Sequence, residues 1–124
     1  HPLGTGKVGA VGFCYGGGVV NNLAARMPNV PDAGVPFYGS QVTVEEAANI
    51  RTPLVFQNAS TDTRILAGAP VYEAALRRAG VSFESHIYEG ASHGFHNNTT
   101  PRYDEAAAAL AWERTVDWFN RYLF

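Results

Sequence analysis

Gly12-Phe13-Cys14-Tyr15-Gly16-Gly17-Gly18 occupies positions 12–18, where a short apolar segment gives way to one with helical spacing. The preceding run, residues 7–13, is apolar and contains glycine, which indicates a buried strand. In residues 16–27 the apolar side chains share one helical face: Val19, Val20, Leu23 and Ala24. Glycines on both sides of Cys14 relieve crowding where a strand turns sharply into a helix. The sequence therefore predicts a cysteine at a strand end, directly before a helix.

The same alternation of segments continues to the end of the chain. After the strand at 7–13 we expect strands at residues 33–38, 53–58 and 81–88. We expect helices at residues 16–27, 44–50, 69–79 and 103–124, the last with Trp112, Val116 and Phe119 on its apolar stripe. Such alternation is typical of an α/β fold, a parallel β-sheet flanked by helices. The strands are expected to follow one another in the sheet as they do in the chain.

The composition excludes several classes of protein. The 124 residues are 46% hydrophobic and 16% charged, which suits one domain with a packed core. Nine basic and eleven acidic residues give a net charge of -2, which argues against a nucleic-acid partner or an anionic membrane surface. A single cysteine excludes an internal disulfide and a multi-cysteine metal site. No apolar run approaches the ~18 residues that cross a bilayer.

One glycine motif points towards a cofactor but stands in the wrong place. Gly4-Thr5-Gly6-Lys7-Val8-Gly9 matches the G-x-G-x-x-G pattern of dinucleotide-binding turns, yet it precedes the first strand instead of following it. We therefore expect no cofactor and no metal ion. We expect no signal peptide and a cytoplasmic location, with the periplasm as the alternative because the chain begins with histidine and not with methionine.

Three residues with chemical potential, Cys14, Asp62 and His93, each follow a different predicted strand. Taken singly they have plainer interpretations: a buried cysteine, a helix-capping aspartate and an exposed loop histidine. Together they stand in the order nucleophile, acid, histidine, which is the order of the α/β-hydrolase triad. A helix N-terminus favours the thiolate of Cys14, and His93, oriented by Asp62, would take its proton. The backbone N–H of Tyr15 is placed to stabilise an oxyanion.

The chain resembles the C-terminal half of the dienelactone hydrolase (carboxymethylenebutenolidase) family. The matching stretches are GFCYGGG (12–18), PFYGS (36–40), TDTRI (61–65), YEGASHGF (88–95) and TTPRYDEAAAALAWERTVDWF (99–119). The resemblance implies a hydrolase of lactones or carboxylic esters, with Cys14, Asp62 and His93 as catalytic residues and Tyr15 as the N–H donor. Residues 1–124 would then form a partial α/β-hydrolase domain that lacks its N-terminal strands.

The chain also departs from the family pattern. Asn97 stands where the dienelactone-cleaving members have an arginine that binds the substrate carboxylate, and Arg64 and Arg102 are the candidate replacements. The family's second oxyanion donor lies upstream of the matching region. We therefore expect the chain alone to be inactive or poorly stable, and to associate with an N-terminal chain or a second copy of itself. Two alternatives remain open: a thiol redox sensor at Cys14, and a non-catalytic fragment.

Overall fold

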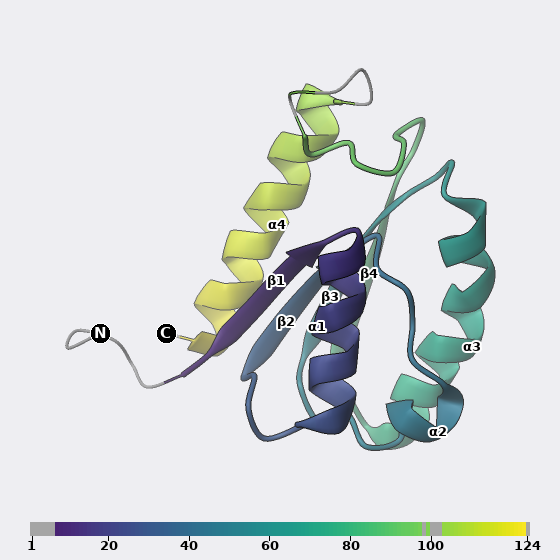
Figure 1. Ribbon diagram of the computed structural model, residues 1–124. Helices are drawn as coiled ribbons and strands as arrows, with labels where there is room; N and C mark the ends of the chain where they lie inside the picture. Colours follow the sequence, from purple (N-terminus) through teal and green to yellow (C-terminus); the bar gives the residue numbers. More distant parts are fainter. Residues whose placement is uncertain (1–6, 98, 100–102, 124) are drawn as a thin grey trace.

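The computed structural model describes residues 7–97, 99 and 103–123. Gly4, Thr5 and Gly6, the first three residues of the G-x-G-x-x-G match, and Arg102 lie outside the described residues. The strands are β1 (Gly9–Phe13), β2 (Ala33–Phe37), β3 (Leu54–Ala59) and β4 (Phe83–Tyr88). The helices are α1 (Tyr15–Arg26), α2 (Val44–Ala47), α3 (Thr63–Ala79) and α4 (Glu105–Leu123). Strands and helices alternate along the described chain, so the predicted order of elements is confirmed (Figure 1).

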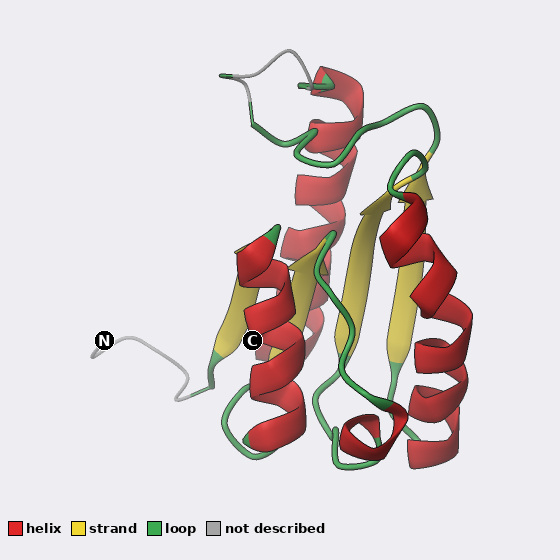
Figure 2. Cartoon of the chain, turned by 45° about the vertical axis from the view of Figure 1, so that its right-hand side comes forward, coloured by secondary structure: helices red, strands yellow, loops and turns green. Residues whose placement is uncertain are grey.

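The four strands of the described chain form one parallel sheet in the order β1-β2-β3-β4. Phe13 at the end of β1 lies beside Phe37 of β2, and Phe37 lies beside Gln57 of β3. The predicted parallel α/β fold is therefore confirmed. Since all strands run in one direction, their carboxyl ends meet at one edge of the sheet, and ligands of such sheets bind there (Figure 2).

Helices cover both faces of this sheet. Helices α1, α2 and α3 lie on one face, and α4 lies alone on the other (Figures 1 and 2). Every residue of β2 and β3 is buried, as expected of strands covered on both faces. None of the described helices is both long enough and apolar enough to cross a membrane.

Helix α3 begins earlier than the pattern predicted, at Thr63 rather than at residue 69. Proline favours the first turn of a helix, but Pro70 lies inside α3. The start is set instead by the loop after β3, where Leu66 N–H donates to the carbonyl oxygen of Asp62 at 3.1 Å. Asp62 thus lies between a buried strand and a helix.

The predicted apolar stripe of α4 is mostly wrong. Trp112 is 54% exposed and Val116 is 40% exposed, while Phe119 is partly buried against the core. The buried residues of α4 lie to one side of this stripe: Ala111, Thr115 and Trp118. Two of these three side chains, Ala111 and Thr115, are small and let this part of the helix approach the sheet closely. Gln57 Nε2 on β3 donates to the carbonyl oxygen of Ala111 at 3.1 Å.

This packing gives a test of the buried face of α4. Replacing Ala111, which is fully buried, with leucine should lower the free energy of unfolding by about 1–3 kcal/mol, because an overpacked core must shift to admit the larger side chain. The matched control is Ala109→Leu, at an exposed position of the same helix. Urea unfolding of both variants measures the difference. Equal stability of the two would contradict the assigned face.

Candidate active site

The cysteine turn forms as the sequence predicted, between the end of β1 and the start of α1. Cys14 has φ 56° and ψ -116°, an uncommon backbone conformation for a residue with a side chain. Such conformations cost about 1–3 kcal/mol and persist only where neighbours fix them. Here Cys14 N–H donates to the carbonyl oxygen of Phe37 at 3.0 Å, and Gly17 N–H donates to the Cys14 carbonyl at 3.0 Å. The strained turn is therefore held by both β2 and α1.

Glycines make this turn possible by allowing backbones to touch. A Cβ on Gly12 would lie 2.1 Å from the carbonyl oxygen of Gly16, and a Cβ on Gly39 would lie 2.1 Å from the carbonyl carbon of Gly17. Real Cβ atoms do not approach so closely, and both obstacles are backbone. Gly16, in contrast, has nothing within 4 Å of its Cβ position. The first turn of α1 is thus clamped between β1 and the loop after β2.

Asp62 and His93 are joined by a hydrogen bond. His93 Nδ1–H donates to Asp62 Oδ2 at 2.5 Å, and the carboxylate is mostly buried. Asp62 holds the N-cap position of α3 but makes no side-chain hydrogen bond to that helix. A carboxylate only accepts, so the bond fixes the proton on Nδ1 and leaves Nε2 of a neutral His93 as an acceptor. The Asp62 carboxylate therefore bonds to His93 and does not cap α3.

The loops that carry these two residues are tied to each other. Thr61, beside Asp62, donates both its N–H and its hydroxyl to the carbonyl oxygen of Ala91, at 3.3 and 3.0 Å. Gly90 N–H donates to the hydroxyl oxygen of Ser60 at 2.8 Å. The relative position of Asp62 and His93 therefore depends on four loop residues as well as on their own bond.

Cys14, Asp62 and His93 line one cavity of about 390 Å³. Its other lining residues come from the turn after β1, the end of β2 and the start of α3: Tyr15, Tyr38, Ser40, Arg64 and Ile65. A neighbouring hollow of about 320 Å³ shares Cys14, Tyr15 and Ser40 with it. Cys14, Tyr15, Asp62 and His93 thus line one cavity at the carboxyl edge of the sheet.

Two residues at this edge were missed by the sequence analysis, Tyr38 and His96. Tyr38 follows β2, is 1% exposed and has a positive φ of 40°. Its hydroxyl is hydrogen-bonded to His96 Nδ1. At the end of an apolar run, Tyr38 reads as a core residue, and His96 reads as one exposed loop histidine among several. Only the glycine after Tyr38 signalled a turn there.

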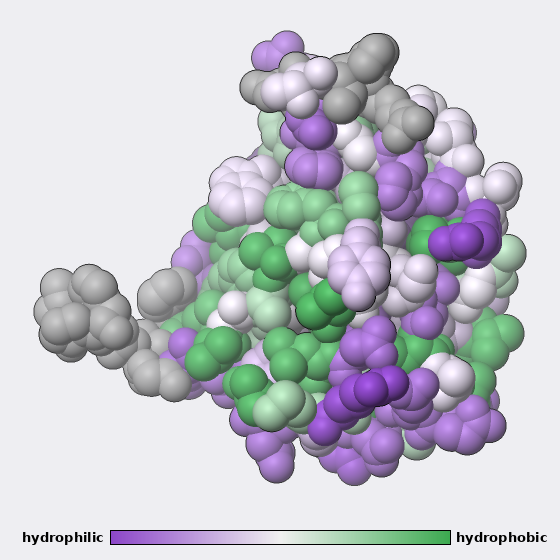
Figure 3. Space-filling view, in the orientation of Figure 1, coloured by the Kyte–Doolittle hydropathy of each residue, from purple (hydrophilic) through white to green (hydrophobic). Residues whose placement is uncertain are grey.

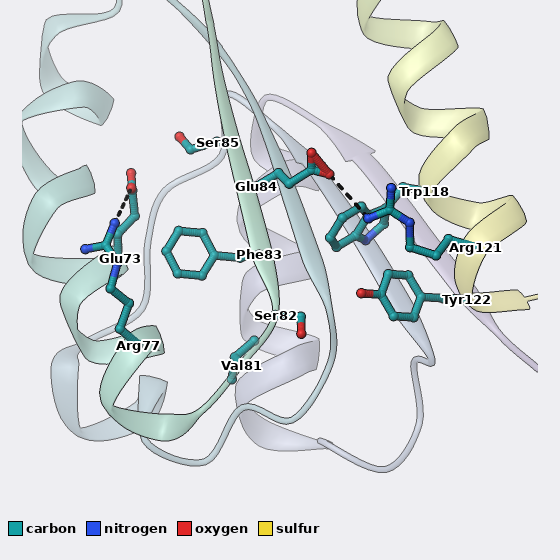
Figure 4. A pocket seen from close by; sticks show the side chains of 10 residues that line it. All are labelled: Glu73, Arg77, Val81, Ser82, Phe83, Glu84, Ser85, Trp118, Arg121 and Tyr122. Carbon is teal, nitrogen blue, oxygen red and sulfur yellow. Dashed lines mark ion pairs between the residues drawn. The ribbon is translucent and has the colours of Figure 1, made fainter.

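A larger hollow of about 660 Å³ lies at the outer edge of β4, between α3 and α4 (Figure 4). Two ion pairs flank it, Arg77 with Glu73 at 3.9 Å and Arg121 with Glu84 at 3.8 Å. It shares no residue with the Cys14 cavity, and its lining contains no cysteine or histidine. Among the residues that the structure describes, no group of three potential ligands is placed to hold a metal ion.

A parallel sheet with a strained strand-to-helix turn at its carboxyl edge defines the α/β-hydrolase class. Residues 2–123 match the model of the dienelactone hydrolase family, and the chain belongs to that family. The resemblance noted from the motifs is therefore confirmed.

Individual relatives agree with this assignment. The chain is 37% identical to protein usf of Aquifex pyrophilus, covering 94% of this chain and 52% of that protein. It is 33% identical to hydrolase tropI of Talaromyces stipitatus, covering 94% of this chain and 46% of that protein. The dienelactone hydrolase structure from Anabaena variabilis shares the fold, with a TM-score of 0.74 and 24% identity over 95% of this chain and 50% of that one. The chain spans about half the length of the curated relatives it matches.

The close backbone contacts of Gly12 with Gly16 and of Gly39 with Gly17 predict how the turn responds to substitution. Gly12→Ala should displace α1 from β1 and lower the unfolding free energy by several kcal/mol, since its methyl group collides with backbone. Gly16→Ala is the matched control: its methyl group meets open space, and alanine favours a helix over glycine by about 1 kcal/mol. Chemical unfolding of the two variants decides the point. A Gly12→Ala protein as stable as Gly16→Ala would refute the close contact between Gly12 and the first turn of α1.

Proposed function

We propose that this chain carries the catalytic triad of an enzyme that hydrolyses a carboxylic ester or a lactone. Cys14 is the nucleophile, His93 the general base and Asp62 the residue that orients the base. The observation that carries this proposal is the hydrogen bond from His93 Nδ1 to Asp62 Oδ2, made beside a cavity that Cys14 also lines. Membership of a hydrolase family supports it.

The first half of the proposed reaction forms an acyl-enzyme. His93 Nε2 accepts the thiol proton of Cys14, and Sγ attacks the carbonyl carbon of the substrate. The negative charge that develops on the carbonyl oxygen is stabilised by the N–H of Tyr15, the first residue of α1, because this N–H has no intrahelical acceptor. The intermediate collapses to a thioester, and the alkoxide leaves with the proton from His93. In a lactone, the alkoxide stays attached to the acyl group.

The second half releases the product. His93, now neutral again, takes a proton from a water molecule that attacks the thioester carbon. The carbon–sulfur bond breaks, the carboxylic acid is released, and the thiol of Cys14 recovers its proton from His93. Asp62 stabilises the imidazolium form of His93 in both halves without itself taking the proton.

Arg64 supports a narrower choice of substrate. It is exposed at the start of α3 and lines the cavity together with Cys14 and His93. Arg64 and Arg102 are the two candidate replacements for the arginine that binds the substrate carboxylate in the family. Of these, Arg64 lies within the described residues. An ester or lactone with a free carboxylate is therefore the substrate that the cavity suits best, since a guanidinium binds a carboxylate through paired hydrogen bonds.

The redox alternative receives less support. A thiol sensor at Cys14 requires neither Asp62 nor His93, and the hydrogen bond between those two side chains serves no purpose in it. A triad uses both residues.

The triad is tested by substituting its members in the protein expressed from its natural gene. Cys14→Ala should abolish hydrolysis of p-nitrophenyl acetate, and Cys14→Ser should retain little, because a serine hydroxyl lacks the low pKa of a thiol. Asp62→Asn should lower kcat by about 10⁴-fold through the wrong tautomer of His93. Asp117→Asn, at an exposed position of α4, is the control and should leave kcat unchanged. An alanine variant at Cys14 with full turnover would remove the nucleophile from its role.

The sheet edge at β1 supports a further part of the proposal. β1 pairs with β2 on one side, and exposed apolar side chains lie on it, directly before it and on the helices beside it: Val8, Val11, Val19, Trp112 and Val116. Apolar surface gathers on this side of the molecule (Figure 3). Val19, which belongs to the apolar face predicted for α1, is 49% exposed here. We propose that this edge pairs with further strands, from an N-terminal chain or a second copy, because unpaired edges recruit strands.

Light scattering on the 124-residue chain tests this pairing. The chain should associate as its concentration rises, and Val11→Lys on β1 should weaken the association, because a charge on an edge strand opposes pairing. Val71→Lys, at an exposed position of α3, should have no effect. A well-folded monomer with full esterase activity would overturn the proposed association.

A further inference from the structure

We propose that Tyr38 and His96 form a positioning pair that holds the imidazole of His93 in place beside Cys14; this inference rests on the catalytic roles proposed above. His96 is the central member. His96 does not line the substrate cavity and has no described contact with Asp62. Its ring contacts Phe13, which precedes the nucleophile, and Tyr38, which packs against the base His93. Its role is therefore to orient the machinery and not to take part in the reaction.

Tyr38 forms the wall against which His93 rests. The centroids of the Tyr38 and His93 rings are 4.8 Å apart, and both residues line the cavity that Cys14 shares. Tyr38 is buried and its φ of 40° lies in the left-handed region, which bulky residues avoid. Its N–H donates to the carbonyl oxygen of Gln57 at 2.9 Å, so β3 fixes this unusual backbone. A strained tyrosine at a site edge indicates a functional constraint.

His96 holds the hydroxyl of this tyrosine from two directions. The Tyr38 hydroxyl is hydrogen-bonded to His96 Nδ1, and the backbone N–H of His96 donates to the Tyr38 oxygen at 3.4 Å. We assign His96 the Nε2–H tautomer, in which Nδ1 accepts from a protonated phenol and the imidazole is neutral. Burial raises the pKa of Tyr38, which keeps its proton in place. Burial, and to a lesser degree the charge of His93, lower the pKa of His96, which keeps its imidazole neutral at pH 7.

His96 also contacts the strand that carries the nucleophile. Its ring stacks on Phe13, the residue before Cys14, with centroids 4.1 Å apart. The titratable groups that interact with His96 are Tyr38 after β2 and His93 in its own loop, and Tyr38 in turn interacts with Cys14 after β1. One imidazole links the turn of the nucleophile to the tyrosine that supports the base. Loss of this support should leave the His93 ring less firmly held.

The test distinguishes the effect of the hydrogen bond to His96 Nδ1 from the effect of the ring stacking of His96. His96→Phe keeps the ring stack on Phe13 but removes the acceptor, whereas His96→Asn keeps an acceptor near the position of Nδ1. Tyr38→Phe removes the donor from the same bond. Kinetics with p-nitrophenyl acetate should show that His96→Phe and Tyr38→Phe each lower kcat by about ten- to a hundredfold with KM little changed, since misplacement of a catalytic group acts on the chemical step. The double variant should be no slower than either single one, and His96→Asn should regain most of the rate.

His86→Phe is the matched control, since His86 lies on β4 outside the cavity and should tolerate the change with wild-type kcat. Wild-type kinetics in His96→Phe would overturn the pairing, and so would equal losses in His96→Phe and His96→Asn.

A second readout does not depend on ester turnover. The pH dependence of Cys14 alkylation by iodoacetamide reports the ionisation of the thiol next to its base. In His96→Phe the inflection should move to higher pH by about half a unit or more, because a loosely held His93 stabilises the thiolate less. In His86→Phe it should not move. If the wild-type protein hydrolyses no ester, the proposed function fails while this profile still tests the pair, and an unchanged profile in His96→Phe refutes it.

Discussion

The site depends on the close approach of the first turn of α1 to two neighbouring strands. Gly12 faces Gly16, and Gly17 faces Gly39, at separations that leave no room for a Cβ. This contact forces Cys14 into its uncommon backbone conformation and brings its thiol to the carboxyl edge of the sheet. A helix that lay further from the sheet would relax the turn, and the thiol would no longer share a cavity with His93.

The remaining site residues reach that edge by a different route. Asp62 and His93 lie on loops, and loops are fixed by hydrogen bonds more than by packing. The Thr61 and Ser60 contacts join the acid loop to the histidine loop, and the bond between Asp62 and His93 crosses the same junction. Tyr38 and His96 add the contact to β1 and β2. The positions of the site residues are thus fixed by several hydrogen bonds and ring contacts among the loops that follow the strands.

The sequence was sufficient to predict the parallel sheet, because strand and helix periodicities alternate without interruption. It was also sufficient to predict that Cys14, Asp62 and His93 line one cavity, since residues in the loops after parallel strands converge in such a fold. It failed for the buried face of α4, where Ala111 is selected for its small size and a hydrophobic stripe is therefore misleading. It failed for Tyr38 because a left-handed backbone at a non-glycine residue leaves no pattern in the sequence.

The central claim is that Cys14 becomes acylated in a reaction that His93 and Asp62 promote. Mass spectrometry of the protein mixed rapidly with p-nitrophenyl acetate, followed by proteolysis at acidic pH, measures this directly. The account predicts one acetyl group on the peptide that contains Cys14, lost again as the ester is consumed, with slower formation in Asp62→Asn. Hydrolysis of the ester with the acetyl group on another residue, or with no acetyl group on Cys14 at any time, would contradict it.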